Sequence, residues 1–286
     1  MKLGARKGYD LSMTEPGILW ITFNRPESKN GMTSTIKREL IETLTQAQMD
    51  NGVRVIVFTG SGDSFSAGDD LKGYSTGLRE DDGQVPLIPA GHDSGIGTYE
   101  GLRVISQALN TAVRNMDKIT IAAMNGIAIQ TGFSLALACD FRIAASTARM
   151  GSATLRFALL PDEGGPYLLM QHLGLARTMD FLMRKKIVTA AEAQEMGLVN
   201  EVVAPGELMS ATEALAREMA EGPQVAMRLL KRCVYNAAEM NWAQSLDDIA
   251  AKTAIVDHHP DSREGVASFK ERRTPSFNAW LSKTGS

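Results

Sequence analysis

Two short turns in the chain have the composition of a backbone anion site. Phe65-Ser66-Ala67-Gly68-Asp69-Asp70 and Gln130-Thr131-Gly132 each follow a short apolar run and contain small residues. Where such a turn leads from a strand into a helix, the first amide groups of the helix lack intrahelical partners and can bind a negatively charged oxygen. One turn of this kind is more typical of a tight connection, whereas the two together favour an anion-binding site.

A third segment, Leu160-Pro161-Asp162-Glu163-Gly164-Gly165, places two carboxylates ahead of a predicted helix. A carboxylate in a binding site can act as a general acid or base. Asp162 could instead cap the helix predicted from Gly165 to Leu173, but we favour the catalytic role. Glu163 is the weaker catalytic candidate, because its side chain should point away if that of Asp162 points into the site.

Other possible nucleophiles and bases are less favoured. Ser134 would need a base to act as a nucleophile, and no histidine lies near it in the sequence, so a position at a helix start is the preferred interpretation. The histidines are predicted to be structural or solvated; they are His92, His172, His258 and His259. A few loop residues could line an acyl pocket or be solvated: Tyr74, His92, Asp93 and Tyr99.

The elements that must position these residues alternate as in an α/β fold. Residues 18–23 and 53–59 are β-branched and aromatic runs typical of buried strands. Apolar residues at three- and four-residue spacing between them predict a helix, with Thr33 or Ser34 as its cap. A stretch rich in glycine and proline, from Gly73 to Gly101, predicts a long surface loop.

Further along the chain the pattern changes from mixed to helical. A helix is expected around residues 104–116, and short strands are expected over 141–144 and 148–150. After Pro205, helical periodicity covers residues 207–220, 224–238, 242–256 and 262–272 without a strand signal. We therefore predict a mixed α/β core over residues 1–205 and a C-terminal helical region over residues 206–286.

Composition excludes several classes of function. The 286 residues are 44% hydrophobic and carry a formal net charge of −3, so there is no basic excess for nucleic acid. Cys139 and Cys233 can build neither a disulfide framework nor a metal site, which predicts a cytoplasmic protein. The uncharged run from Ile119 to Cys139 has the length of a membrane span, but its polar breaks favour a buried strand, a turn and a buried helix. Signatures of P-loop, dinucleotide-binding, zinc-protease and α/β-hydrolase proteins are absent from the sequence.

Several long motifs together resemble the enoyl-CoA hydratase/isomerase (crotonase) superfamily. They are ITFNRPESKN, FTGSGDSFSAGDDL, AAMNGIAIQTGFSLALACDFRIA, ALLPDEGGPYLL and KKIVTAAEAQEMGLVNEVV, in that order between Ile18 and about Phe277. The resemblance implies an α/β crotonase-like spiral of ββα units, an acyl-CoA thioester as substrate with no other cofactor, and a homotrimer or dimer of trimers. Nucleic-acid and membrane partners are not expected.

The resemblance also assigns roles to individual residues. It implies that the backbone N–H groups of Ala67 and Thr131 hold the thioester oxygen and stabilise an enolate. Thr131 replaces a common glycine, but a backbone donor does not depend on its side chain. Further residues are implied to contact the substrate: Ser28, Lys29, Asp69, Leu71, Ser134, Thr154, Phe269 and Arg272. Of these, Phe269 and Arg272 match the positions with which family members reach CoA in a neighbouring subunit, or they form an ordinary solvated helix end.

The reaction is less determined than the family. The two glutamates that hydratases of this family share correspond to Ser134 and Thr154, and neither can serve as a carboxylate acid or base. Asp162 matches a catalytic aspartate of similar dienoyl-CoA isomerases, 4-chlorobenzoyl-CoA dehalogenases and hydroxyisobutyryl-CoA hydrolases. Hydration, isomerisation, hydrolysis of a thioester or β-dicarbonyl, and non-catalytic acyl-CoA binding all stay open. A Clp-type peptidase is disfavoured because no Ser/His/Asp set is discernible.

Overall fold

The computed structural model describes residues 1–70 and 94–281, which form two β-sheets with helices around them. The large sheet has the strand order β1-β2-β3-β4-β6-β8-β11, and the small sheet has the order β10-β9-β7-β5. The strands of the large sheet are β1 (Gly4–Ala5), β2 (Tyr9–Thr14), β3 (Ile18–Phe23), β4 (Val55–Gly60), β6 (Ile119–Met124), β8 (Phe141–Ala145) and β11 (Glu201–Val203). Those of the small sheet are β5 (Ser64–Ser66), β7 (Ile127–Ile129), β9 (Arg149–Gly151) and β10 (Ile187–Thr189).

The chain winds as a spiral because successive strands alternate between the two sheets. It passes from β4 to β5, from β6 to β7 and from β8 to β9, and a helix follows each pair before the chain returns to the large sheet. Within the large sheet, β3, β4, β6, β8 and β11 pair in parallel. The predicted spiral of ββα units is confirmed.

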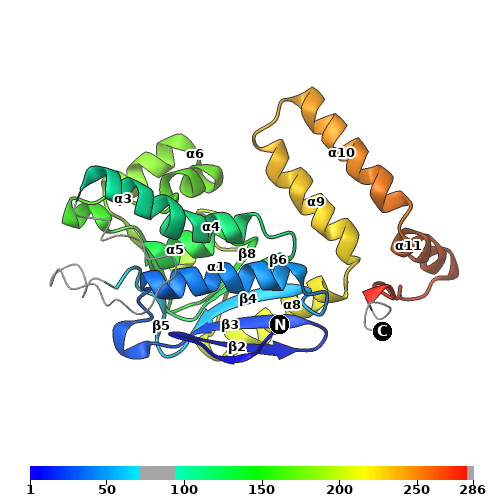
Figure 1. The fold of residues 1–286 in the computed structure, drawn as a ribbon, viewed down its shortest axis with the longest axis horizontal. Helices are drawn as coiled ribbons and strands as arrows, with labels where there is room; N and C mark the ends of the chain where they lie inside the picture. The colour runs from blue at the N-terminus through cyan, green and yellow to red at the C-terminus, as the bar shows by residue number, and fades with distance from the viewer. Residues whose placement is uncertain (71–93, 282–286) are drawn as a thin grey trace.

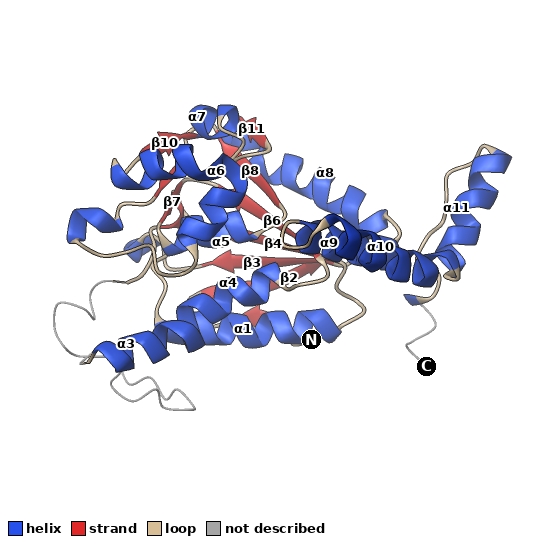
Figure 2. Ribbon diagram, turned by 90° about the horizontal axis from the view of Figure 1, so that it is seen from above, coloured by secondary structure: helices blue, strands red, loops and turns tan. Residues whose placement is uncertain are grey.

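Strands of the large sheet are buried on both faces, which explains their continuous apolar sequences. Along β4, Val55 and Val57 face one core, while Ile56 and Phe58 face the other. Side chains that alternate across a strand must all be apolar when helices cover both sides of the sheet. Helix α8 (Leu208–Glu221) covers the first face, and α1 (Ser34–Met49), α4 (Gln107–Arg114) and α5 (Thr131–Ala138) pack in the second core (Figure 2).

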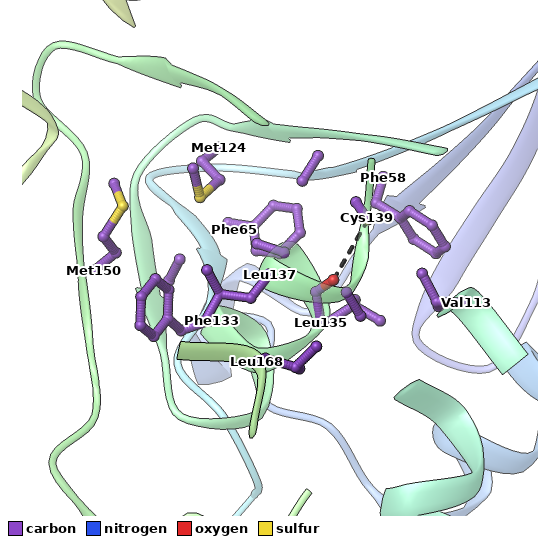
Figure 3. Close-up of a cluster of buried hydrophobic side chains, with 14 of the residues drawn as sticks. Phe58, Phe65, Val113, Met124, Phe133, Leu135, Leu137, Cys139, Met150 and Leu168 are labelled. Carbon is purple, nitrogen blue, oxygen red and sulfur yellow. Dashed lines mark hydrogen bonds between the residues drawn. The ribbon is translucent and has the colours of Figure 1, made fainter. Parts of the chain in front are cut away.

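The second core surrounds α5, the helix that begins at one of the two predicted anion-binding turns. Each of its eight residues is buried. Figure 3 shows Phe133, Leu135 and Leu137 of this helix among Phe65, Met124 and Leu168, which come from β5, β6 and α6 (Gly165–Met183). A wholly buried helix of this length cannot move independently of its neighbours, so its N-terminus is a fixed point of the fold.

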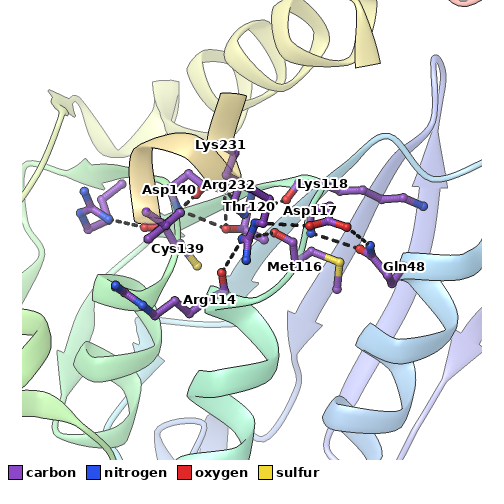
Figure 4. Close-up of polar contacts among 12 residues, drawn as sticks. Gln48, Arg114, Met116, Asp117, Lys118, Thr120, Cys139, Asp140, Lys231 and Arg232 are labelled. Atoms are coloured by element: carbon purple, nitrogen blue, oxygen red, sulfur yellow. Dashed lines mark hydrogen bonds and ion pairs between the residues drawn. The ribbon is translucent and has the colours of Figure 1, made fainter. Parts of the chain in front are cut away.

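The C-terminal helices extend from the body of the molecule as an arm. Helices α9 (Gln224–Ala237) and α10 (Trp242–Asp257) run side by side, and α11 (Pro260–Glu271) lies at the end far from α3 (Gly95–Gly101) and α5 (Figure 1). A buried ion pair ties α9 to the core: Lys231 Nζ lies 2.7 Å from Asp140 Oδ2, and the same carboxylate accepts the Thr120 amide (Figure 4). The division of the chain at residues 205 and 206 stays a prediction. Helix α8 lies after this boundary but packs on the large sheet, in the same core as Val55 and Val57.

Most predicted elements agree with the structure. The strand over residues 18–23 is confirmed at both ends, Thr33 accepts the Ile36 amide as the helix cap, and the uncharged run folds as β6, β7 and α5. The prediction of a loop as far as Gly101 is wrong, because α3 begins at Gly95 with Ser94 as its cap and continues through a π-helical turn, Leu102–Ser106, into α4. Within the described residues, no helix combines the length and apolar composition needed to cross a bilayer.

Candidate active site

The two anion-binding turns meet at the N-terminus of α5. Gly68 has a φ of +99°, and a Cβ atom there would lie 3.1 Å from the Ile129 carbonyl oxygen and 3.6 Å from the Thr131 amide nitrogen. Only glycine combines this backbone conformation with so close an approach. The turn after β5 therefore passes directly against the first residue of α5, as the sequence predicted.

The structure corrects one of the two predicted oxyanion donors. The amide of Ala67 donates to the carbonyl oxygen of Lys29 at 2.9 Å, so it is not free to bind a ligand. Within the described residues, the amides of Asp69 and Thr131 donate no hydrogen bond to protein. Because Thr131 is the first residue of its helix, its amide has no carbonyl four residues earlier to which it could donate within the helix. The available donors are therefore the amides of Asp69 and Thr131, with Asp69 in place of the predicted Ala67.

Gln130 holds the start of α5 in an unusual conformation. Its φ of 49° and ψ of −112° are outside the common regions for a residue with a side chain. Gln130 Nε2 donates to Glu163 Oε2 at 2.9 Å, and Gln130 Oε1 accepts from Ser152 Oγ at 2.9 Å. Contacts at both ends of the Gln130 side-chain amide thus hold this strained backbone conformation in place. Strained residues of this kind are typical of functional sites.

A buried polar network joins the two turns. Thr131 Oγ1 lies 2.6 Å from Asp69 Oδ1 and 2.5 Å from Glu163 Oε1. Lys37 of α1 forms an ion pair with Asp69 Oδ1 at 2.7 Å and donates to Ser106 Oγ at 2.8 Å. Three segments far apart in sequence therefore meet at the Thr131 side chain, and α1 joins them through the contact of Lys37 with Asp69.

Asp162 and Glu163 both lie at this network. The carbonyl of Asp162 accepts from Gln107 Nε2, and that of Glu163 accepts from Asn110 Nδ2, so α4 fixes their backbone. Burial raises the pKa of Asp162, and the charge of Asp69 raises it further. Burial also raises the pKa of Glu163 to about 7, with Asp69 and Asp162 adding to the effect.

Neither carboxylate caps the helix that follows. Helix α6 starts at Gly165 with Gly164 as its N-cap, without a side-chain cap, so the alternative role of Asp162 as an N-cap is wrong. The expectation that Glu163 points away from the site is also wrong, because its carboxylate contacts Thr131 and Gln130. A sharp turn before α6 lets consecutive side chains approach the same network.

Other predicted substrate residues surround this site to different degrees. Ser134 is buried one turn into α5, and Thr154 Oγ1 lies 3.5 Å from Ser152 Oγ, next to the Gln130 amide. Ser28 and Lys29 lie in and just after the short helix Pro26–Ser28, and Lys29 forms an exposed ion pair with Asp63. Leu71 lies outside the described residues.

Phe269 and Arg272 are not brought to this site within one chain. Phe269 is 85% exposed on α11, and Arg272 follows the same helix, at the far end of the arm (Figure 1). Tyr99 lies exposed on α3, while Tyr74, His92 and Asp93 are outside the described residues. Burial lowers the pKa of His172 to about 4, as expected for a structural histidine.

Sequence reasoning gave no role to several members of the network. Lys37, Ser106 and Ser152 lie outside the motifs, and Gln130 lies in the turn before α5 but no contact was predicted for its side chain. A buried lysine in an amphipathic helix is indistinguishable from a solvated one by sequence alone. The amide of Asp69 was missed because the sequence does not show which amide of a turn is already bonded. The sequence showed that residue 163 is a glutamate, but it did not show that this side chain points toward Thr131 and Gln130.

Comparison with known proteins places the chain in one family. The family model for enoyl-CoA hydratase/isomerase matches residues 13–86 and 90–280. A 1,2-epoxyphenylacetyl-CoA isomerase of Escherichia coli is 32% identical over 93% of this chain and 97% of that protein. A hydroxycinnamoyl-CoA hydratase-lyase of Pseudomonas fluorescens is 30% identical over 93% and 94%.

Solved structures agree with the sequence comparisons. An enoyl-CoA hydratase from Bacillus anthracis superposes with a TM-score of 0.85 at 29% identity, covering 95% of this chain and 99% of that one. The two sheets and the helices around them are therefore arranged as in that enoyl-CoA hydratase. The chain belongs to the enoyl-CoA hydratase/isomerase family.

Proposed function

We propose that this protein isomerises a carbon–carbon double bond of an acyl-CoA thioester through an enolate. One observation carries the choice: the carboxylates at the network are Asp69, Asp162 and Glu163. The family resemblance matches Ser134 and Thr154, which carry no carboxylate, to the two hydratase glutamates. Hydration in the manner of those enzymes needs two carboxylates around a water molecule. Isomerisation moves one proton between two carbons, so a single base is sufficient.

The proposed steps use residues of this chain only. The Asp162 carboxylate takes a proton from the carbon next to the thioester carbonyl, and the C–H electron pair moves toward the carbonyl oxygen. The amides of Asp69 and Thr131 bind the oxygen as it becomes negative, and loss of one such donor typically costs about 3 kcal/mol in the barrier. Protonated Asp162 then returns the proton to the far end of the conjugated system, which leaves the enzyme unchanged.

The environment of Asp162 supports its role as the base. Its pKa is raised by burial and by the negative charge of Asp69, and is lowered to a smaller extent by Lys37. A carboxylate with a raised pKa exchanges protons more readily near neutral pH than an ordinary one. The isomerase named among the relatives is consistent with this chemistry, and the hydratase-lyase marks addition of water as the competing reaction.

Binding and assembly are proposed from the family resemblance. CoA enters as part of the substrate, without a separate cofactor, and Ser28, Lys29 and Leu71 lie on the chain segments expected to contact it. We propose a homotrimer or dimer of trimers in which Phe269 and Arg272 of one subunit reach the CoA of a neighbour. A cytoplasmic location stays a prediction.

The test is a substrate panel with one variant pair. Purified protein is incubated with crotonyl-CoA, a 3-enoyl-CoA and several β-hydroxyacyl-CoA thioesters, and the products are separated by chromatography and identified by mass spectrometry. We expect conversion of the 3-enoyl-CoA to its 2-enoyl isomer. Release of free CoA would instead indicate a hydrolase, and acyl-CoA binding without turnover would indicate a non-catalytic binder.

The variant pair tests the base. Asp162→Asn should keep acyl-CoA binding and lose turnover by roughly 10²–10⁴-fold, the usual contribution of general acid/base catalysis. Asp180→Asn is the control, because Asp180 is an exposed carboxylate on α6 that pairs with Arg184 and Lys186. Turnover of the Asp162→Asn variant at the wild-type rate would contradict the proposal.

A further inference from the structure

The hydroxyl of Thr131 lies between two carboxylates. Its oxygen is 2.6 Å from Asp69 Oδ1 and 2.5 Å from Glu163 Oε1, and both distances are those of short hydrogen bonds. A threonine hydroxyl has one hydrogen, so it donates to only one of these oxygens. If both carboxylates were ionised, the other contact would place two oxygen atoms together with no hydrogen between them. The geometry therefore requires one more proton.

The surroundings decide which carboxyl carries that proton. Asp69 contacts the Lys37 ammonium at 2.7 Å, and its side chain is 38% exposed, so a positive charge and water both lie beside this carboxylate. Glu163 is 3% exposed, and within the described residues it forms no ion pair. Its second oxygen accepts the Gln130 amide, whose orientation is set because the opposite end accepts from Ser152. The proton belongs on Glu163 Oε1, which donates to Thr131, while Thr131 donates to Asp69.

We propose that Glu163 is a neutral positioning residue, which orients the Thr131 hydroxyl toward Asp69 and keeps negative charge away from the amides that bind the thioester oxygen. The catalytic part of this proposal rests on the proposed function; the protonation of Glu163 does not. Ionised Glu163 would place a negative charge beside Thr131, where the enolate also becomes negative, and would repel it. A neutral carboxyl keeps the same hydrogen bonds without that repulsion.

Burial and the charged groups on the neighbouring elements together set the pKa of Glu163. Burial raises its pKa to about 7, and the charges of Asp69 in the turn after β5 and of Asp162 in its own turn add to this. The hydrogen bond that Glu163 shares with Thr131 of α5 and the charge of Lys37 on α1 lower this pKa by smaller amounts. Below this pKa Glu163 is neutral, and above it the residue becomes ionised. The site should therefore lose enolate stabilisation as the pH rises through 7.

Protonation can be measured without any substrate. In protein labelled with ¹³C-glutamate, infrared difference spectra should show a label-shifted protonated carboxyl band at pH 6 that disappears as the pH rises through about 7. The band should be absent from Glu163→Gln and present in Glu192→Gln, because Glu192 caps α7 (Ala190–Glu195) and its pKa is lowered by hydrogen bonds from Thr189. A spectrum without this band at pH 6, or a band that persists in Glu163→Gln, would overturn the proposal.

The positioning role is measured by the pH dependence of kcat/KM. If only neutral Glu163 supports turnover, a single titration near pH 7 lowers wild-type kcat/KM about tenfold between pH 6 and pH 8. Glutamine copies the protonated acid, since its amide nitrogen donates to Thr131 and its oxygen accepts from Gln130. Glu163→Gln should therefore change less than about twofold over the same interval. An unchanged tenfold loss in this variant would overturn the positioning role.

The two measurements separate this proposal from the proposed function. A protein with no turnover on any acyl-CoA but with a Glu163 carboxyl band that titrates near pH 7 would contradict the proposed function and support the protonation. Isomerase turnover without a Glu163 carboxyl band would support the proposed function and contradict the protonation of Glu163.

Discussion

Thr131 takes part in the site through two independent groups. In the part of the chain that the structure describes, its amide donates no hydrogen bond because the residue begins α5, and its hydroxyl joins the carboxylates of Asp69 and Glu163. A side chain is not needed for the first role, so a substitution of the common glycine is compatible with an oxyanion site. The second role is specific to a hydroxyl, because a glycine there would leave Asp69 and Glu163 without their shared partner.

The corrected donor pair leads to a prediction about ligand position. In a complex with an unreactive acyl-CoA analogue, the thioester oxygen should lie about 3 Å from the amide nitrogens of Asp69 and Thr131. Ala67 should keep its hydrogen bond to Lys29, as in the ligand-free protein. A crystal structure of the complex provides the measurement. An oxygen bound to the Ala67 amide, with the Lys29 contact broken, would restore the original assignment.

Neutral Glu163 also predicts a pH dependence of stability. Its pKa of about 7 in the folded protein is above the ordinary value of 4.5, so folding binds a proton between these two values. The stabilisation is fully present below pH 4.5 and is lost as the pH rises through 7; its size is up to about 3 kcal/mol. The free energy of unfolding of the wild type should therefore fall relative to Glu163→Gln between pH 5 and pH 8.

Urea denaturation at the two pH values provides this measurement. Glu192→Gln is the matched control, since the lowered pKa of Glu192 means that it stays ionised throughout this range. Its difference from wild type should be constant. Parallel stability curves for the wild type and Glu163→Gln would show that Glu163 is ionised in the folded protein at both pH values.

At the scale of elements, the site depends on how closely α5 approaches β5. A Cβ atom on Gly132 would lie 2.4 Å from the Ser66 carbonyl oxygen, a distance that real Cβ atoms do not adopt. Gly132 is in the first turn of a completely buried helix, so the backbone of β5 and the helix cannot separate without disturbing the core shown in Figure 3. The spacing between the Asp69 and Thr131 amides is therefore set by Gly132, which follows Thr131 in the chain but is not itself one of the two donors.

Replacement of this glycine should affect both folding and chemistry. Gly132→Ala should lower the free energy of unfolding by about 1–3 kcal/mol, the usual cost of overpacking, and should reduce turnover by moving the Thr131 amide. Gly206→Ala is the control, because a Cβ atom there meets no other atom within 4 Å. Thermal denaturation and the isomerase assay measure the two effects. A Gly132→Ala protein with wild-type stability would show that β5 and α5 adjust independently.

At the scale of the whole molecule, the arm exposes more apolar surface than an isolated chain should tolerate. Trp242 is 77% exposed at the start of α10, and the arm also exposes Leu230, Val234, Leu246, Ile249, Ile255, Val266 and Phe269. Apolar surface of this extent usually marks an interface. The helices that carry it are the ones that project from the body in both Figure 1 and Figure 2.

The exposed arm predicts an assembly, and the family resemblance implies three or six subunits, a mass that light scattering should give at micromolar concentration. Trp242→Asp should shift the mass toward the monomer, since it places a charge in the proposed contact. Met49→Asp is the control, because Met49 is 79% exposed but lies at the end of α1 on the body. A monomeric wild type would contradict both the assembly and the contact of Phe269 and Arg272 with a neighbour's substrate.

The sequence by itself determined the family, the alternation of strands and helices, and the places where the chain turns. These depend on local properties: the spacing of apolar side chains, glycine at turns, and motifs in a fixed order. Residues 18–23 could be predicted because the run is β-branched and aromatic throughout, and the four C-terminal helices because their apolar residues recur at helical spacing. The motifs that contain Thr131 and Asp162 marked both residues as candidates for the site.

Tertiary structure alone decided how those residues act together. Whether the Ala67 or the Asp69 amide is free depends on the Lys29 carbonyl, which is almost forty residues away along the chain. The direction of the Glu163 side chain depends on Gln130 and Thr131, and the Asp69 carboxylate is contacted by Lys37 from α1. Hydrogen bonds and protonation states are set by the distances between groups in space, and the pattern along the sequence does not contain those distances.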